Sequence, residues 1–297
     1  MKLQKVTDCE KALNNFSSEE IVARAQLFAG VEAGTTFWSR EVFEKGAVKV
    51  LELCKAGEYR EDVKSILKSN GHQVLEKLAE FKINFLIPGN QFDELPAPPI
   101  GLTYRGDIQL LERRIVAIVG TRNPTPYGSK VAAEFAANFA DREWVVASGG
   151  AYGIDSAAHK GALISEGETI AVMASGLDVL YPAGNSRLFS AIEENGLLIS
   201  EYMPGTPALP FRFLNRNRII AAISEGTIVV EAAFRSGSLR TARDAESIRR
   251  KVLAIPGPIN SPLSEGCHRL IGEGAAVICT GVNDAWICSH CWQAKYR

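Results

Sequence analysis

The amino-acid sequence predicts an α/β fold in which a doubly wound, mostly parallel sheet follows a small all-helical region. Short apolar runs alternate with helical patterns from Arg114 onward, and each run is continuous rather than alternately apolar and polar. A parallel sheet that helices cover on both faces requires such continuous runs of Val, Ile and Ala. The alternation itself indicates successive strand–helix units. Seven strands are expected, at residues 115–119, 144–147, 169–173, 197–199, 227–230, 252–255 and 275–278.

Residues 1–85 are expected to form the helical region as a separate domain. They are rich in Lys, Glu, Ala and Leu, and apolar positions such as Val63, Ile66 and Leu67 recur at helical spacing. Basic and acidic side chains balance over this stretch, so charge indicates no nucleic-acid-binding face there. A structural or protein-contacting role is the simpler hypothesis for this domain.

A proline-rich linker is expected over residues 86–100. Proline cannot continue a helix, and it restricts the preceding residue to extended conformations. Because Phe92 and Leu95 interleave with the prolines, we expect the linker to pack against a domain. The α/β domain is then expected over residues 101–282, followed by a cysteine-containing tail over residues 283–297.

The composition bounds the cellular setting. The sequence has no apolar run long enough to span a bilayer and no N-terminal signal pattern, so a cytoplasmic location without a membrane partner is expected. Six cysteines, four of them near the end, argue against a secreted disulfide scaffold. The formal charge of −1 excludes a long-range positive field, so any nucleic-acid site must be a local patch.

Glycine and serine follow several of the expected strands, at the edge where an open parallel sheet binds ligands. Glycine lets a backbone approach a phosphate closely, and the N-terminus of the next helix attracts an anion. No single turn is a known phosphate-binding fingerprint, but together they favour a crevice for a phosphate-bearing ligand. The residues are Gly120, Thr121 and Arg122; Gly149, Gly150 and Gly153; Ser175 and Gly176; and Ser236, Gly237 and Ser238.

Basic side chains concentrate in the same half of the sequence, where nine stand against four acidic ones between residues 205 and 255. Arginines beside expected turns are the candidate phosphate ligands, because the forked guanidinium group suits phosphate oxygens. They are Arg122, Arg212, Arg216 and Arg218. Phe211 and Phe213 flank Arg212, an alternation that suits base stacking, although a core position explains either ring equally well.

Six motifs stand in order along the second half of the chain. They are GTRNPTPYG (120–128), SGGAYGIDSAAHKGAL (148–163), GLDVLYPAGN (176–185), NRNRIIAAIS (215–224), VVEAAFRSGSLRTA (229–242) and AIPGP (254–258). As an ordered set they closely resemble the DNA-processing protein A (DprA/Smf) family, over about residues 86–281. The resemblance implies a Rossmann-like domain that binds single-stranded DNA, forms a homodimer, protects incoming strands and hands them to the recombinase RecA during natural transformation. It also implies a SAM-like N-terminal domain and no cofactor.

The resemblance further implies which residues line the strand-binding pocket. Motif by motif, these are Arg122; Gly149, Gly150 and Gly153; Arg216, Asn217 and Arg218; and Ser236, Gly237 and Ser238. Arg212 and Phe213 are added because they lie close to residues 216–218. The sequence departs from the family pattern at Arg240, Arg249 and His268, where the changes add positive charge.

The end of the sequence also departs from the pattern. Many family members carry a C-terminal winged-helix domain, which is not expected here because the sequence stops at Arg297. The last residues hold Cys279, Cys288, His290 and Cys291. A structural zinc site needs four ligands at settled spacing, and one C-x-x-C pair supplies two, so no metal is expected.

Two other functions stay open for the same fold. A nucleotide phosphoribohydrolase would need acid–base groups, for which Asp155, His159 and Glu231 are the plausible residues, but the Pro-Gly-Gly turn of such enzymes is missing. Asp155 is more simply a helix N-terminal charge or cap, and His159 a helix-face residue. A nucleotide sensor could hold one mononucleotide in the same crevice. We therefore expect a binding protein rather than an enzyme.

Overall fold

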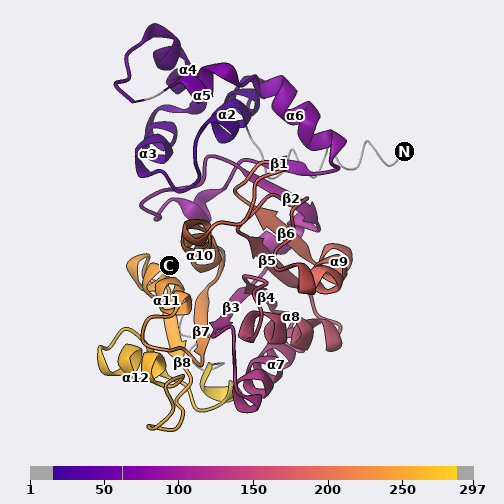
Figure 1. Cartoon of the computed structure of the whole chain (residues 1–297), viewed down its shortest axis with the longest axis vertical. Helices are drawn as coiled ribbons and strands as arrows, with labels where there is room; N and C mark the ends of the chain where they lie inside the picture. Colours follow the sequence, from indigo (N-terminus) through magenta and orange to yellow (C-terminus); the bar gives the residue numbers. More distant parts are fainter. Residues whose placement is uncertain (1–15, 62, 286–297) are drawn as a thin grey trace.

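The computed structural model describes residues 16–61 and 63–285, and this part of the chain contains a nine-stranded sheet (Figure 1). The strand order is β1-β2-β6-β5-β4-β3-β7-β8-β9. Neighbouring strands from β6 to β9 are parallel, whereas β1 and β2 add an antiparallel edge. The strands are β1 (Asn84–Leu86), β2 (Leu102–Gly106), β3 (Ile115–Gly120), β4 (Val145–Ser148), β5 (Thr169–Met173), β6 (Leu197–Ser200), β7 (Gly226–Val230), β8 (Lys251–Ala254) and β9 (Val277–Ile278). The expected α/β class is confirmed.

All seven expected strands are present, but β1 and β2, the antiparallel pair at one side of the sheet, were not predicted. Each is short, and together they flank the proline-rich segment, whose composition is typical of turns. They form because β2 pairs with β6, in a register that places Tyr104 opposite Ile199, and β1 then pairs with β2. Long-range pairing of this kind leaves little local signal in the sequence.

Helices cover both faces of the sheet. Alternate residues along each central strand point to opposite faces, so that Ala117 packs in the core beneath α10 and α11 while Ile118 packs in the core beneath α7 and α8. The continuous apolar runs of the sequence follow from this double burial. The helices are α7 (Pro126–Ala140), α8 (Ile154–Ile164), α9 (Ser186–Asn195), α10 (Pro210–Ile223), α11 (Gly237–Ser247) and α12 (Glu265–Gly272).

The segment between β1 and β2 packs closely, as its apolar residues predicted. Phe92 and Leu95 are both buried, in the same core cluster as the sheet residues Leu102 and Tyr104. Phe92 lies on a short 3-10 turn, η1 (Asn90–Phe92), that contacts α10. The proline-rich stretch therefore carries part of the hydrophobic core.

From Phe16 onward, the described residues contain five helices before the sheet, which lie together at one end of the molecule (Figure 1). They are α2 (Ser18–Gly30), α3 (Thr36–Lys45), α4 (Ala47–Ala56), α5 (Lys64–Lys68) and α6 (Gly71–Glu80). Leu27, Trp38, Val42 and Val50 are among the side chains that form their common core. None of the helices in the described ranges is long and apolar enough to cross a bilayer.

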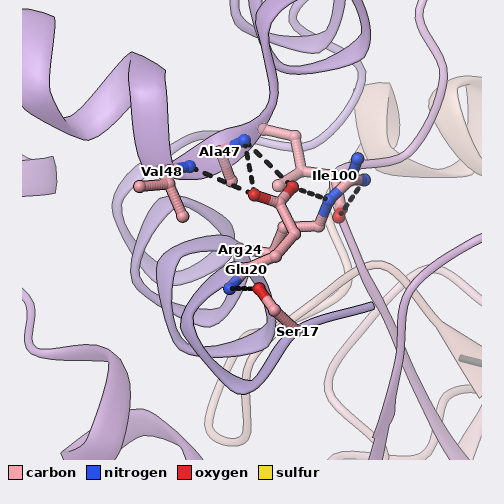
Figure 2. Close-up of polar contacts among 6 residues, drawn as sticks. All are labelled: Ser17, Glu20, Arg24, Ala47, Val48 and Ile100. Carbon is pink, nitrogen blue, oxygen red and sulfur yellow. Dashed lines mark hydrogen bonds and ion pairs between the residues drawn. The ribbon is translucent and has the colours of Figure 1, made fainter. Parts of the chain in front are cut away.

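The carboxylate of Glu20 ties several of these helices together (Figure 2). It accepts hydrogen bonds from the backbone amides of Ala47, at 2.9 and 3.1 Å, and Val48, at 3.2 Å. These amides are the unpaired donors at the start of α4, whose N-cap Gly46 has no side chain to satisfy them. Glu20 also pairs with Arg24 at 2.9 Å, and Arg24 donates to the carbonyl of Ile100. One partly buried acid thus links α2 and α4, and its arginine partner links α2 to the segment before β2.

Candidate functional site

A pocket of about 570 Å³ lies at the carboxyl ends of β3 and β7. β3 is paired with β4 on one side and with β7 on the other, so the chain reverses its direction of travel across the sheet between these strands. Ligands of open parallel sheets bind at such a reversal. The walls come from the turn after β3, the first turn of α8, the loop at Tyr181, and the N-terminal parts of α10 and α11.

Seven of the twelve expected site residues line this pocket. They are Arg122, Phe213, Arg216, Asn217, Ser236, Gly237 and Ser238. They belong to three separate segments of the sequence: the turn after β3, the first half of α10 and the start of α11. The fold of the sheet brings these segments together at one edge. The crevice expected from the Gly- and Ser-rich turns is therefore present, and the role of its residues in DNA binding stays a prediction.

Arg122 and two aromatic rings form one wall. Arg122 is exposed and forms no ion pair with any described residue. Its guanidinium carbon lies 4.8 Å from the centroid of the Phe213 ring, within the range of a cation–π interaction. The ring of Tyr181 lies 5.6 Å from that of Phe213, tilted by 58°. Tyr181 was missed by the sequence analysis, because its place in a loop after β5 gave no periodic signal.

Arg216 lies behind this wall and is buried. Its Nη1 donates to the carbonyls of Gly149, at 2.5 Å, and Val172, and its Nε donates to the Asn217 side chain at 3.3 Å. Burial lowers the pKa of Arg216 to about 10; the Asp155 carboxylate opposes this shift and the nearby Arg122 charge adds to it. The charges of Arg122 and Arg216 therefore both face the pocket, an arrangement that an anionic ligand would stabilise.

The glycine turn after β4 leaves the space that the Arg216 guanidinium occupies. A side-chain carbon on Gly149 would lie 2.2 Å from the Arg216 guanidinium, so only glycine leaves room for it. Asp155, in the first turn of α8, accepts from the backbone amides of Gly149 at 3.2 Å and Ala151 at 3.4 Å. Its burial raises its pKa, and the Arg216 charge opposes that rise. Asp155 thus holds the turn in place from the first turn of α8, whose N-cap is Gly153 rather than Asp155.

The other two expected glycines lie behind the pocket lining. Gly153 has φ of +81° and sits against the backbone carbonyls of Thr121 and Arg122, so a side chain there would displace the Arg122 turn. Gly150 has φ of +68° and packs against the ring of Phe189. Both serve the shape of the turns rather than the surface of the pocket.

The N-terminus of α11 forms the opposite wall. Its N-cap residue Ser236 makes no side-chain capping hydrogen bond, and the Ser236 and Ser238 hydroxyls instead bond to each other at 2.7 Å. Asn217 of α10 donates to the carbonyl of Gly237 at 3.0 Å and so joins the two helices. An uncapped helix start beside serine hydroxyls is a suitable site for a phosphate group.

Arg212 and Arg218, both expected in the pocket, lie outside its lining. Arg212 forms a two-bond ion pair with Glu32, at 2.9 and 2.8 Å. Arg218 pairs with the buried Glu201 at 2.7 and 2.6 Å. Both are close to Arg216 in the sequence, but they lie on a different face of α10 from Arg216.

The acid–base groups considered for an enzyme are engaged in structural contacts. Glu231, with φ of +49°, accepts from the amide of Thr125 at 2.8 Å and from its hydroxyl at 2.5 Å, which satisfies the start of α7. The ring of His159 is buried and hydrogen-bonded to Thr169 at 2.7 Å, and burial lowers its pKa to about 3. Of the three candidates, Asp155 alone lines the pocket.

The cysteine-containing tail falls mainly outside the described residues, which include Cys279 but not Cys288, His290 or Cys291. Cys279 is buried, with its thiol 3.4 Å from the Gly281 carbonyl. The described residues contain no group of three or more His, Cys, Asp or Glu side chains placed to hold a metal ion.

Fold and site together define a Rossmann-like ligand-binding protein with a cationic, partly aromatic pocket at the reversal point of its sheet. The chain belongs to the DNA recombination-mediator protein A family, whose model matches residues 88–289. The resemblance that the motifs indicated is confirmed.

Individual relatives agree with this assignment. The chain is 51% identical over 165 residues to a putative DNA processing protein DprA of Mycobacterium tuberculosis, covering 56% of this chain and 42% of the relative. It is 47% identical over 188 residues to DNA processing protein DprA of Streptococcus pneumoniae, covering 63% and 66% respectively. The chain thus spans between about two-fifths and two-thirds of the length of these curated relatives.

Two solved structures are also similar. The crystal structure of DprA from Streptococcus pneumoniae has a TM-score of 0.79 and 32% identity, covering 91% of this chain and 98% of that one. A structure of DNA processing protein A from Helicobacter pylori, described for its single-stranded DNA binding mode, has a TM-score of 0.66 and 32% identity, covering 73% and 98%.

Proposed function

We propose that this chain binds single-stranded DNA in the pocket between β3 and β7, without altering the strand chemically. The observation that carries the proposal is the stack of Arg122 on Phe213 in the same pocket as Arg216. A guanidinium group suits a phosphate, and an adjacent ring suits a base. The similarity to the Helicobacter pylori protein, whose single-stranded DNA binding has been described structurally, supports the same ligand class.

Each wall has its own part in this proposal. Arg122 and the uncapped start of α11 bind phosphodiester oxygens, while Phe213 and Tyr181 offer faces on which bases stack. Arg216, buried behind them, supplies charge and holds the Gly149 turn. A duplex is a poor ligand because its stacked, paired bases cannot reach the rings.

The oligomeric state, the cellular location and the protein partner are inferred from the family. We propose that the protein acts as a homodimer in the cytoplasm, protects incoming strands and hands them to a RecA-type recombinase during transformation or recombination. Membership of the DNA recombination-mediator protein A family supports these proposals.

A binding role also agrees with the positions of the acid–base candidates. A phosphoribohydrolase needs a carboxylate free to assist bond cleavage, and Glu231 is engaged at the start of α7 while His159 is buried. A nucleotide sensor would use the same pocket for one mononucleotide, so ligand length separates that hypothesis from strand binding.

Fluorescence anisotropy with labelled oligomers of equal length tests the proposal. Single strands should bind more tightly than duplex, and the logarithm of the affinity should fall with the logarithm of salt, with a slope of about −0.7 per phosphate neutralised. Arg122→Ala should weaken binding and flatten the slope. Equal affinity for duplex, or competition by a mononucleotide as strong as that by the oligomer, would contradict strand binding. Release of free base on incubation would favour the enzyme instead.

A further inference from the structure

The loop between α2 and α3 packs against α10, the helix that carries six of the residues lining the pocket (Figure 1). Arg212 donates from Nε and Nη2 to the two carboxylate oxygens of Glu32. One turn further along α10, Asn215 donates to the carbonyl of Ala33 at 3.0 Å. Gly34 follows with φ of +78°, and a side-chain carbon there would lie 3.1 Å from the Asn215 side chain. The loop is thus fitted to two successive turns of the helix.

The residues of α10 divide between two faces. Arg212, Asn215 and Arg218 recur every three residues and therefore form one stripe, which meets the α2–α3 loop and the buried Glu201. Phe213 and Arg216 are also three apart, but on the neighbouring stripe that faces the pocket. A movement of the first stripe therefore moves the second, because both belong to one rigid helix.

Every nitrogen of the Arg212 guanidinium is already hydrogen-bonded within the protein. Its Nε and Nη2 are bound to Glu32, and its Nη1 donates to the Pro207 carbonyl at 2.8 Å. Its side chain is 11% exposed. The hydrogen bond to Glu32 raises the pKa of Arg212, so the guanidinium stays protonated.

The start of α10 needs external support. Its N-cap, Leu209, has no side-chain group to bond the first amides, and the first residue of the helix is Pro210. Arg212 is the third residue of the helix, so the Glu32 carboxylate is held beside the first turn. A negative charge there is also favourable to the helix dipole.

We propose that Glu32 is a positioning residue for the strand-binding pocket: through Arg212 it fixes the first turn of α10, and thereby the places of Phe213 and Arg216. This inference rests on the proposed binding of single-stranded DNA. It makes the N-terminal helices part of the binding apparatus although they supply no residue to the lining of the pocket.

Replacing Glu32 separates this role from direct contact, because the two make opposite predictions. If Arg212 were a phosphate ligand, Glu32→Gln would release it, remove a negative charge and tighten binding. As a positioning residue, Glu32→Gln weakens binding of a single-stranded oligomer by about threefold, since the Glu32 side chain is 45% exposed and the pair is partly screened. Arg212→Gln has the same effect, and neither changes the salt slope.

The experiment measures anisotropy for both variants, their double variant and a matched control, across a salt series, with folding checked by circular dichroism. The control is Glu52→Gln, which also removes one acid from the N-terminal helices. Glu52 and its partner Lys49 are both exposed, so this pair should have no part in positioning α10. The double variant should bind no more weakly than Arg212→Gln alone, because both changes break one interaction.

Three results would overturn the inference while the wild-type protein still binds the oligomer. These are unchanged or tighter binding by Glu32→Gln, a flatter salt slope for Arg212→Gln, and additive losses in the double variant. Should Arg212→Gln fail to fold, Glu32→Gln decides alone by the sign of its effect. Absence of binding by the wild-type protein would instead contradict the proposed function.

Discussion

The guanidinium carbon of Arg122 lies 4.8 Å from the ring centroid of Phe213, which brings the turn after β3 into contact with α10. The two residues are 91 positions apart in the sequence and meet because β3 ends and α10 begins at the same edge of the sheet. Charge and aromatic surface are thereby paired at one point. This pairing predicts that the two side chains contribute to strand binding in distinguishable ways.

Phe213→Leu should weaken single-stranded DNA binding without altering its salt dependence. Loss of base stacking costs about 1–3 kcal/mol per base, or roughly 5- to 150-fold in affinity, but leaves the number of neutralised phosphates unchanged. Phe211→Leu is the matched control, since Phe211 is exposed and absent from the pocket lining. Anisotropy at several salt concentrations measures both. A loss for Phe211→Leu as large as that for Phe213→Leu would show that the pocket ring has no special part.

Gly149→Ala should weaken binding without removing any charge. The new methyl group would lie 2.2 Å from the Arg216 guanidinium, which must move, at a cost of about 1–3 kcal/mol in the free energy of unfolding. Gly272→Ala is the control, because a side-chain carbon at that position in α12 meets no atom within 4 Å. Chemical denaturation and oligomer binding are measured on both variants. Wild-type affinity in a stable Gly149→Ala protein would mean that the place of Arg216 does not matter.

The sequence predicted the parallel strands of the sheet well and the antiparallel strands β1 and β2 poorly. The run at residues 115–119 is apolar because both faces of β3 are buried, and that cause acts locally enough to be read from five residues. Leu102–Gly106 becomes a strand because β6 is available to pair with it, almost a hundred residues away. Pairing partners of this kind are not written in a local pattern.

The candidate site shows the same limit at the level of single side chains. Arg212, Arg216 and Arg218 look equivalent in sequence, and only the start of α10 at Pro210 decides which of them faces the pocket. Arg212 and Arg218 are six residues apart, a spacing that places them on one stripe of a helix. Without the helix boundary, however, the sequence does not show which way that stripe faces. Tyr181 gave no such signal, because its position depends on the loop after β5 rather than on a periodic pattern.

His159 predicts a loss of stability in acid. Its imidazole is buried with a pKa lowered to about 3, chiefly by desolvation, whereas in the unfolded chain it titrates near 6.5. Between these values only the unfolded state takes up the proton, so the contribution is complete above pH 6.5 and is lost as the pH falls toward 3. The loss approaches about 1.4 kcal/mol per pH unit.

His159→Gln should therefore flatten the dependence of the free energy of unfolding on pH in this window, measured by urea denaturation between pH 6.5 and 4. The raised pKa values of Asp155 and Glu201 act in the opposite direction, and comparison of the two proteins removes their effect because both contain these acids. His72→Gln, at an exposed position, is the control. Identical pH profiles for wild type and His159→Gln would show that the imidazole takes up its proton in the folded protein.

Glu20→Ala should loosen the start of α4 while leaving strand binding nearly unchanged. The substitution removes the acceptor of the Ala47 and Val48 amides and the partner of Arg24 (Figure 2). Loss of such a cap costs about 1 kcal/mol, so these two amides should exchange hydrogen roughly fivefold faster. Glu52→Ala removes an exposed acid from the middle of the same helix and should leave their exchange unchanged, because an exposed pair contributes little. Hydrogen exchange of α4 in the whole protein distinguishes the two variants, and equal protection in both would mean that α4 begins without help from Glu20.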